Sequence, residues 1–262
     1  LGERKKFELA AFDIGNLYHS AIKDFFDTIN TNNIKWADLD DKKSENIIND
    51  SIEKVMEQYE NDALNDIARS AFIKKQVKDT STETVNALVK HIRSGNFLPR
   101  EYELRIAHGR VDRVDTFEDG NNIYVKVIDY KSGNKVFNVT ETFLGLQMQL
   151  MVYLKDTVDY IKKNNPDKNV YPAAGLYFHV YDPYVSEIDC EKAVSDFRKN
   201  NPDSELSDEE LKKMAIEKER FKAYRMSGLV AKEIEIVNAM DHNTITKTGS
   251  SAILPVNITK SG

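Results

Sequence analysis

Cysteine is nearly absent from this sequence, which has one, Cys190, among 262 residues. A single cysteine excludes an internal disulfide framework and any metal site built from several cysteines, and it fits a reducing cytoplasm. No apolar run approaches the roughly 18 residues that a membrane-spanning helix needs, so we expect a soluble chain that makes no use of a membrane. Internal repeats, P-loop glycines, CxxC pairs and a serine-nucleophile motif are missing from the sequence as well.

An excess of positive charge is also lacking. The formal net charge is −6, which argues against a free-standing nucleic-acid binder, because phosphate contacts need clustered Lys and Arg. Any affinity for DNA must therefore come from local patches or from further polypeptide. The sequence begins LGERKKFEL, without Met or a signal-peptide pattern, and ends ITKSG, so we expect a piece of a longer protein.

The central feature of the sequence is HGRVDRVDTFEDGNNIYVKVIDYKSG, residues 108–133, which predicts two strands and a turn. Residues 119–122 are turn formers, and 123–131 alternate as a strand does. A hairpin centred on this turn places Asp112 opposite Asp129. Like charges directly opposed across two strands destabilise a sheet, so this register predicts a cation between the carboxylates or a proton on one of them.

Lys131 lies two residues beyond Asp129 and leaves the same face of the strand. A salt-bridged hairpin end is the simpler interpretation of this pair, but the second aspartate in register weakens it. The same register sets Arg110 opposite Lys131, which a bulge near Gly109 would relieve.

Two further acidic residues near the hairpin have open roles. Asp115 faces away from Asp112 by alternation, so we expect a supporting or surface carboxylate. Glu103, on a predicted strand over 100–106, could join an acidic cluster or be solvated.

The first half of the chain predicts helices. Residues 12–29 carry a wide apolar stripe, with His19 beside it. Such a histidine becomes a ligand only if this helix crosses the end of the hairpin. The segment 33–95 predicts three charged helices that serve as scaffold, over 47–59, 63–72 and 82–93. His91 we expect to be a last-turn residue that favours the helix C-terminus.

The second half predicts a covered sheet. Residues 140–161 are apolar nearly all round, as in a helix buried on most sides. Gln149 and Tyr153 share one face of it, where they could reach a common site or satisfy core groups. A strand over 171–181 is expected beside the hairpin, which together predicts an α/β fold with a mixed sheet covered on both faces.

The remaining segments are peripheral. Residues 185–225 are highly charged and predict a helical insertion, opened at one helix by a capping box of Ser207 and Glu210. In the tail, 234–237 and 253–258 predict short extended segments.

Two aspartates, a histidine and a lysine at the rim of a mixed sheet suit one type of chemistry. Carboxylates bind Mg²⁺ through oxygen, and an imidazole makes Mn²⁺ acceptable. Such ions lower the pKa of bound water and stabilise charge on a phosphoryl group. A lysine steadies the attacking water or the developing charge. This set therefore predicts hydrolysis of a phosphodiester.

At this point the sequence resembles a known family. The strings GNLYH, GRVDRVD, IDYKSG and QLMVY together look like the RecB-type branch of the PD-(D/E)XK nucleases. The resemblance implies a restriction-endonuclease-like fold over 1–262, a single domain that includes the helical segment 33–95 and the insertion 185–225.

The resemblance also implies roles for individual residues. His19, Asp112, Asp129 and the main-chain carbonyl of Tyr130 match metal-binding positions, and Asp112, Asp129 and Lys131 match catalytic ones. Gln149 and Tyr153 match a Q-x-x-x-Y element that lies close to the DNA strand. The implied cofactor is Mg²⁺, with Mn²⁺ tolerated.

Several further strings narrow the resemblance to AddB-type subunits of bacterial helicase–nucleases: ERKKFELAAFDIGNLYHSAIKDF, GLQMQLMVYL, AAGLYFHVYDP and SAILPV. This implies an AddA partner, a DNA single strand fed from an unwound duplex, cutting of the 5′-ended strand and a role in double-strand-break repair by homologous recombination.

AddB-type proteins also carry a 4Fe-4S cluster on four cysteines that flank this domain, and Cys190 matches none of them. The cluster is therefore expected only in the full-length protein. Two alternatives stay open: a catalytically weak nuclease fold that binds DNA or a partner, and a Cas4-type nuclease.

Overall fold

The structure is a computed structural model that describes residues 11–63, 67–133, 136–202, 205–245 and 248–259. Its centre is a five-stranded sheet in the order β1-β2-β3-β4-β5. The strands are β1 Leu98–Ile106, β2 Gly109–Asp119, β3 Asn122–Lys131, β4 Asn169–His179 and β5 Ser227–Val230. Only β3 and β4 pair in parallel, whereas the other neighbours are antiparallel. The predicted mixed α/β sheet is therefore confirmed.

The hairpin forms in the register that its turn predicts. Asp119 pairs with Asn122 across a two-residue turn, and Arg113 pairs with Ile128 farther along. Gly120 has φ +55°, a backbone conformation that glycine adopts at little cost. Local turn chemistry therefore fixes which residues of β2 and β3 face each other.

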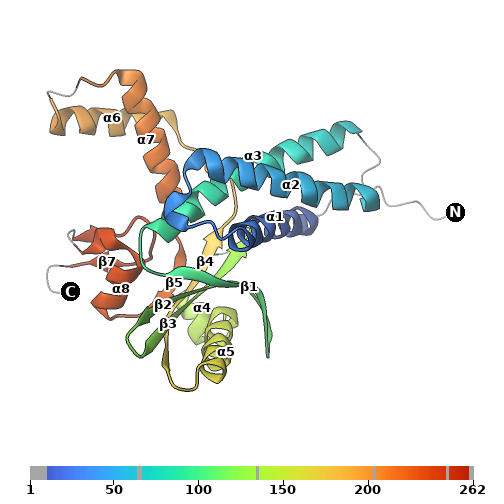
Figure 1. Cartoon of the computed structure of the whole chain (residues 1–262). Helices are drawn as coiled ribbons and strands as arrows, with labels where there is room; N and C mark the ends of the chain where they lie inside the picture. The colour runs from blue at the N-terminus through green and yellow to red at the C-terminus, as the bar shows by residue number, and fades with distance from the viewer. Residues whose placement is uncertain (1–10, 64–66, 134–135, 203–204, 246–247, 260–262) are drawn as a thin grey trace.

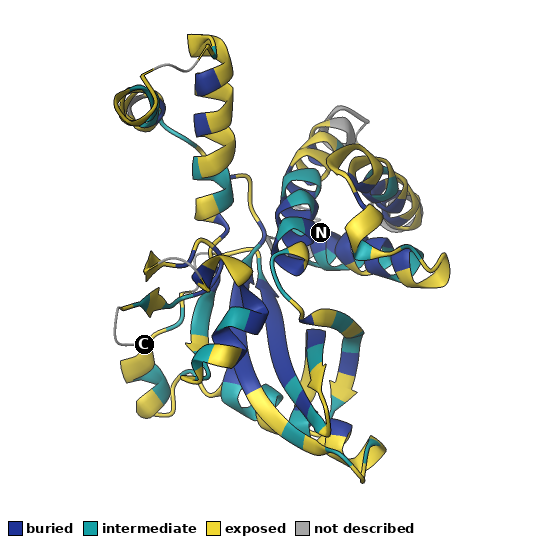
Figure 2. Ribbon diagram, turned by 60° about the vertical axis from the view of Figure 1, so that its left-hand side comes forward, coloured by how far each residue is buried: buried dark blue, intermediate teal, exposed yellow. Residues whose placement is uncertain are grey.

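Helices cover both faces of the sheet (Figure 1). α1 Ala11–Thr31, α2 Asp41–Ala63 and α3 Ile67–Arg93 lie on one face, with the short 3-10 helix η1 Trp36–Asp38 between α1 and α2. α5 Gln149–Asn164 covers the other face and packs on a cluster that includes Val114, Val125 and Val127. Figure 2 shows the buried residues concentrated on the strands and on the inward sides of the helices.

The scaffold helices differ from the prediction at one point. α3 is continuous where two helices over 63–72 and 82–93 are expected, although residues 64–66 lie outside the described part of the chain. Thr80 and Ser81, in the expected gap, are buried. Packing of these small side chains keeps the helix intact despite their modest helix propensity.

A buried charged cluster lies on the α1–α3 face of the sheet. Asp115 is fully buried, with its two carboxylate oxygens 2.7 and 2.8 Å from guanidinium nitrogens of Arg113 and 2.9 Å from Nζ of Lys126. The expectation that Asp115 could be a surface carboxylate is therefore wrong. Burial in apolar surroundings requires such a charge to be paired, and here two cations pair with it.

His91 lies close to this cluster and is also buried, at the last turn of α3. Its ring packs edge-on against Phe178 and Phe221, and neither ring nitrogen has a hydrogen-bond partner among the described residues. Burial first, and then the charges of Lys126 and Arg113, lower the pKa of His91 to about 3. A neutral ring cannot favour the helix C-terminus through charge, so that expectation is wrong.

The predicted buried helix over 140–161 is two helices. α4 Val139–Phe143 begins at Asn138, whose side chain accepts a hydrogen bond from the backbone N–H of Glu141. The helix ends before Gly145, which has φ +80°. The apolar side chains of this stretch are exposed, which contradicts the expectation of burial: Val139, Phe143, Leu144, Leu146 and Met148.

The tail also differs from the prediction. Residues 234–237 belong to a helix, α8 Ile234–Met240, whose Ile236, Val237 and Met240 are buried. Short apolar runs fit a strand or a buried helix equally well, and packing against the sheet selects the helix here. A 3-10 helix η2 His242–Thr244 follows, and β6 Gly249–Ser250 pairs with β7 Asn257–Ile258.

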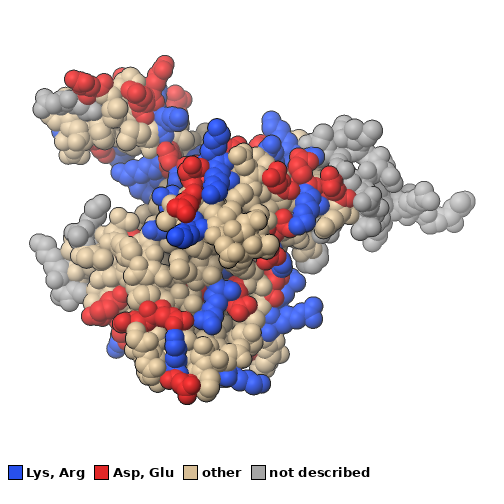
Figure 3. All heavy atoms as spheres, in the orientation of Figure 1, with Lys and Arg blue, Asp and Glu red and all other residues tan. Residues whose placement is uncertain are grey.

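The charged insertion forms α6 Glu187–Asn200 and α7 Asp208–Ala223, which project from the body of the molecule (Figure 1). Its capping box is confirmed, since Ser207 and Glu210 exchange side-chain and backbone hydrogen bonds. Figure 3 shows Lys and Arg interspersed with Asp and Glu over the visible face. Within the described residues, no helix combines the length and hydrophobicity needed to cross a bilayer.

Candidate active site

Three carboxylates lie in a row across the first three strands. Continuing the observed registers sets Asp112 of β2 opposite Glu103 of β1 on one side and Asp129 of β3 on the other. Asp112 and Asp129 are buried, and Glu103 is partly buried. Opposed like charges destabilise a sheet unless a cation lies between them. The row therefore requires positive charge at this edge of the sheet.

Asp112 is held by the backbone of the neighbouring strand. Its Oδ2 accepts a 2.6 Å hydrogen bond from the backbone N–H of Tyr130. Its Oδ1 faces Nδ1 of His19, 3.4 Å away. One oxygen thus fixes the carboxylate and the other is presented to the site.

α1 brings His19 to this row of carboxylates, as the sequence requires if His19 is to be a ligand. The helix approaches β3 closely because Gly15 has no side chain, and a Cβ there would lie 2.9 Å from Oγ of Ser132. The imidazole packs edge-on to Tyr130, with ring centroids 5.8 Å apart. Nδ1 of His19 lies 3.9 Å from Oε1 of Glu103.

The charge state of His19 follows from these neighbours. Burial lowers its pKa, but hydrogen bonds to Asp112 and Glu103 and the charges of both carboxylates outweigh burial and raise the pKa to about 9. A protonated His19 therefore supplies positive charge among the carboxylates. A metal ligand must be a neutral imidazole, so binding of a metal ion here would release a proton.

Glu103 belongs to this site, a role that the sequence left open. Its Oε2 lies 2.6 Å from Nε of Arg110, while Oε1 faces His19. Its backbone has φ +51°, which costs a non-glycine residue roughly 1–3 kcal/mol. Arg110 is thus neutralised by Glu103, which removes the like-charge contact with Lys131 that the hairpin register predicted.

Asp129 and Lys131 form an ion pair beside this group. Nζ of Lys131 lies 5.3 Å from the ring centroid of Tyr177, the cross-strand partner of Asp129 on β4. Burial and the nearby charge of Asp112 raise the pKa of Asp129, although Lys131 and His19 oppose the shift. Tyr177 was missed at the sequence level, where only the parallel pairing of β3 with β4 could have indicated it.

Gln149 and Tyr153 contact each other on α5, with Nε2 donating to the phenol oxygen at 3.0 Å. The ring of Tyr153 lies against Gly109, where a Cβ would come within 2.8 Å of the phenol oxygen. Burial raises the pKa of Tyr177, and the charges of Asp129 and Tyr153 raise it further. Tyr153 and Asp129 therefore act on the same tyrosine, which connects the α5 pair to the catalytic edge.

The donor set fits a hard divalent metal ion. One ligand atom from each of His19, Glu103 and Asp112 lies within 4.8 Å of the other two. Two carboxylates and an imidazole suit Mg²⁺ or Mn²⁺. Asp129 is not one of these three, because its carboxylate pairs with Lys131. The ligand roles of Asp129 and of the Tyr130 carbonyl stay predictions.

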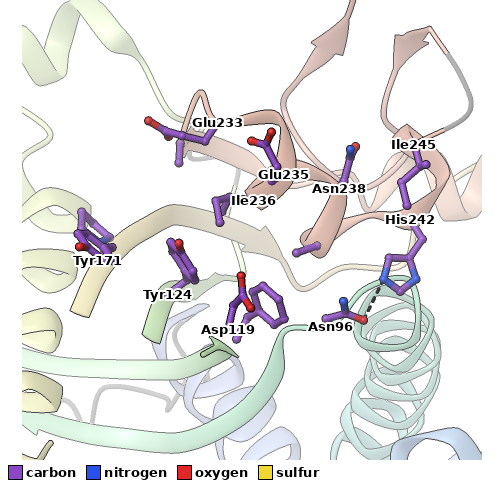
Figure 4. A pocket seen from close by; sticks show the side chains of 14 residues that line it. Asn96, Asp119, Tyr124, Tyr171, Glu233, Glu235, Ile236, Asn238, His242 and Ile245 are labelled. Carbon is purple, nitrogen blue, oxygen red and sulfur yellow. Dashed lines mark hydrogen bonds between the residues drawn. The ribbon is translucent and has the colours of Figure 1, made fainter. Parts of the chain in front are cut away.

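A larger cavity, of about 940 Å³, lies at the opposite end of the sheet (Figure 4). It is lined by Phe117, Tyr124 and Tyr171 from three neighbouring strands, and by carboxylates that include Asp119 and Glu233. None of the described residues that line it is Lys or Arg. An acidic cavity without cations does not suit phosphate, so size alone does not identify the site of chemistry.

The fold and this edge of the sheet agree with the comparison to known families. The PD-(D/E)XK nuclease superfamily matches residues 1–243, and the chain belongs to it. The predicted restriction-endonuclease-like fold is thereby confirmed.

Curated relatives narrow the comparison. The chain is 30% identical over 281 residues to a subunit of the ATP-dependent helicase/deoxyribonuclease of Clostridioides difficile, a match that covers 99% of this chain and 22% of that protein. The protein of the same name from Exiguobacterium sibiricum is 30% identical over 283 residues, covering 100% of this chain and 23% of the relative. These matches confirm the resemblance to AddB-type subunits. The chain spans about a fifth of the length of these relatives.

Proposed function

We propose that this chain is a metal-dependent deoxyribonuclease domain that hydrolyses phosphodiester bonds of a DNA single strand. The observation that carries the proposal is the convergence of His19, Glu103 and Asp112 within 4.8 Å, beside the ion pair of Asp129 and Lys131. Membership of the PD-(D/E)XK superfamily supports the same reaction. We further propose that the described elements form one nuclease domain, with 33–95 and 185–225 as helical additions.

The roles of the residues follow from their contacts. His19, Glu103 and Asp112, joined by Asp129 and the Tyr130 carbonyl, would hold Mg²⁺ or Mn²⁺. When bound, such an ion lowers the pKa of a water molecule and stabilises the charge that builds on the phosphoryl group.

Lys131 acts directly on the reacting atoms. Its ammonium, positioned by Asp129 and the Tyr177 ring, donates to the attacking water or to the developing negative charge. Gln149 and Tyr153 support the DNA strand from α5.

The names of the relatives support a wider role. We propose that the longer protein is an AddB-type subunit that works with AddA in recombinational repair of double-strand breaks, in the cytoplasm, and cuts the 5′-ended strand. The full-length protein would carry the 4Fe-4S cluster on cysteines beyond this sequence, since Cys190 is the only cysteine here and is buried.

The test is release of labelled nucleotides from single-stranded DNA in Mg²⁺ or Mn²⁺, with EDTA and Asp129→Ala as negative controls. Asp119→Ala is a matched control, because this aspartate lies exposed at the far end of β2. We expect cleavage that needs the metal ion, is lost in Asp129→Ala and is retained in Asp119→Ala.

If the isolated chain is inert, the same variants are compared in the longer subunit assembled with its partner. Activity there that survives Asp129→Ala would overturn the assignment. DNA binding without any cleavage would favour the alternative of a binding module.

A further inference from the structure

A small cavity of about 330 Å³ opens beside the candidate metal site. It lies between α1 and the β1–β2 pair. All of its lining residues are polar: Asn16, His19, Ser20, Lys23, Glu103 and Arg110. His19 and Glu103 are shared with the metal site, so whatever occupies this cavity lies next to the reacting centre.

α1 contributes one face to the cavity. Asn16, Ser20 and Lys23 follow one another at spacings of four and three residues, which places them in one row along the helix. An amide, a hydroxyl and an ammonium are all donors to phosphate oxygens. Arg110 provides a guanidinium from β2 on the other side.

Both cations can reach a ligand from solvent. The side chains of Lys23 and Arg110 are 44% and 59% exposed. Lys23 pairs with Asp27 one turn along α1, and such exposed pairs contribute only about 0–1 kcal/mol. Arg110 contacts Glu103 through Nε, and the other donors of its guanidinium can serve a second anion.

We propose that this cavity binds a phosphate of the DNA strand next to the scissile phosphate, with Lys23 and Arg110 as positioning residues. The inference rests on the proposed nuclease function and adds the route by which the strand enters the site, between α1 and β2. Net charge does not oppose it, since two local cations supply what the acidic chain lacks overall. Phosphate next to three carboxylates is repelled unless such cations flank it.

The experiment measures binding of a fluorescent single-stranded oligonucleotide in EDTA at several salt concentrations. Lys23→Gln and Arg110→Gln should each weaken binding several-fold and flatten the plot of log affinity against log salt by about 0.7, the value for one phosphate contact on a single strand. Oligonucleotides with a 5′-phosphate and a 5′-hydroxyl distinguish an end phosphate from an internal one. A loss confined to the 5′-phosphorylated strand assigns the cavity to the strand end.

Two matched controls are present in the chain. Lys155 forms an i,i+4 pair with Asp159 on α5, as Lys23 does with Asp27 on α1. Arg100 pairs with Glu118 between β1 and β2, at the other end of the strands from Arg110 and Glu103. Lys155→Gln and Arg100→Gln should leave the salt dependence unchanged. Equal effects of the cavity and control variants would overturn the proposal.

Cleavage kinetics separate this proposal from the nuclease function. In active protein, Lys23→Gln should raise KM several-fold and change kcat by less than about twofold, since it removes binding that substrate and transition state share. Binding that depends on Lys23 and Arg110 without any cleavage would support the cavity and refute the nuclease function. Cleavage with binding independent of both residues would do the reverse.

Discussion

The backbone N–H of Tyr130 donates a 2.6 Å hydrogen bond to Oδ2 of Asp112, across the last positions of β2 and β3. This bond fixes the carboxylate and directs its Oδ1 to His19. An Asn at this position could keep the hydrogen bond through its carbonyl oxygen but would not supply a charged metal ligand.

Asp112→Asn is therefore expected to fold and to lose metal binding. We expect Mn²⁺ to raise the melting temperature of the parent protein and not that of the variant, and activity to fall by at least about 100-fold. Without metal, the variant should be as stable as the parent or more so, because a like charge has been removed from the row. A variant that Mn²⁺ still stabilises would exclude Asp112 as a ligand.

Asp115→Asn should be far more damaging to stability, although Asp115 lies only three residues away. Arg113 and Lys126 would remain buried without a counter-charge, and breaking a buried pair in this way costs about 3–5 kcal/mol. Urea unfolding measures the loss. Asp119→Asn, which is exposed, should stay within about 0.5 kcal/mol of the parent. A similar small loss for Asp115→Asn would show that the cluster does not depend on this carboxylate.

His91 should make the protein sensitive to acid. Its pKa is lowered to about 3 by burial and by nearby cations, whereas an unfolded histidine has a pKa of about 6.5. Below pH 6.5 the unfolded chain binds a proton that the folded state refuses, so the stabilising contribution is present above pH 6.5 and is lost as pH falls toward 3. The slope is at most about 1.4 kcal/mol per pH unit.

His91→Gln should remove this component. We expect the free energy of unfolding of the variant to fall less steeply between pH 6.5 and 4 than that of the parent. The comparison of slopes is independent of any constant loss caused by repacking against Phe178 and Phe221. Parallel slopes would mean that His91 takes up its proton in the folded state as well.

Gly109→Ala tests the contact between the β1–β2 turn and α5. The backbone of Gly109 has φ +150°, and a Cβ would lie 2.8 Å from the phenol oxygen of Tyr153. Strain of about 1–3 kcal/mol should therefore come with displacement of Tyr153 and a fall in DNA binding. Gly120→Ala has the strained backbone alone, since nothing lies within 4 Å, and should lose stability without losing binding. Equal binding by both variants would exclude Tyr153 from the DNA site.

The exposed apolar stretch distinguishes the structure from the sequence pattern. A Phe in a buried helix costs about 3–5 kcal/mol when truncated. Phe143 is 90% exposed and Leu146 is 73% exposed, so Phe143→Ser with Leu146→Ser should change the free energy of unfolding by less than about 1 kcal/mol. A loss of several kcal/mol in urea unfolding would restore the buried helix that the sequence suggests.

Sequence patterns failed where the deciding contacts lie far apart along the chain. The apolar period over 140–161 suits a buried helix, but Gly145 interrupts it and no described element covers the apolar side chains of α4. Residues 234–237 fit a strand or a helix until they meet the sheet. His91 and Asp115 were placed by local rules, although packing of α3 on the sheet buries both.

By itself, the sequence determined the β2–β3 hairpin and with it the approach of Asp112 to Asp129, because a two-residue turn sets the register of every pair that follows. It also determined that such a register needs a cation. Only the tertiary structure decided what surrounds that pair. Glu103 enters from β1, and His19 enters because Gly15 lets α1 approach Ser132. These contacts join segments about 80 residues or more apart, whose packing no local period encodes.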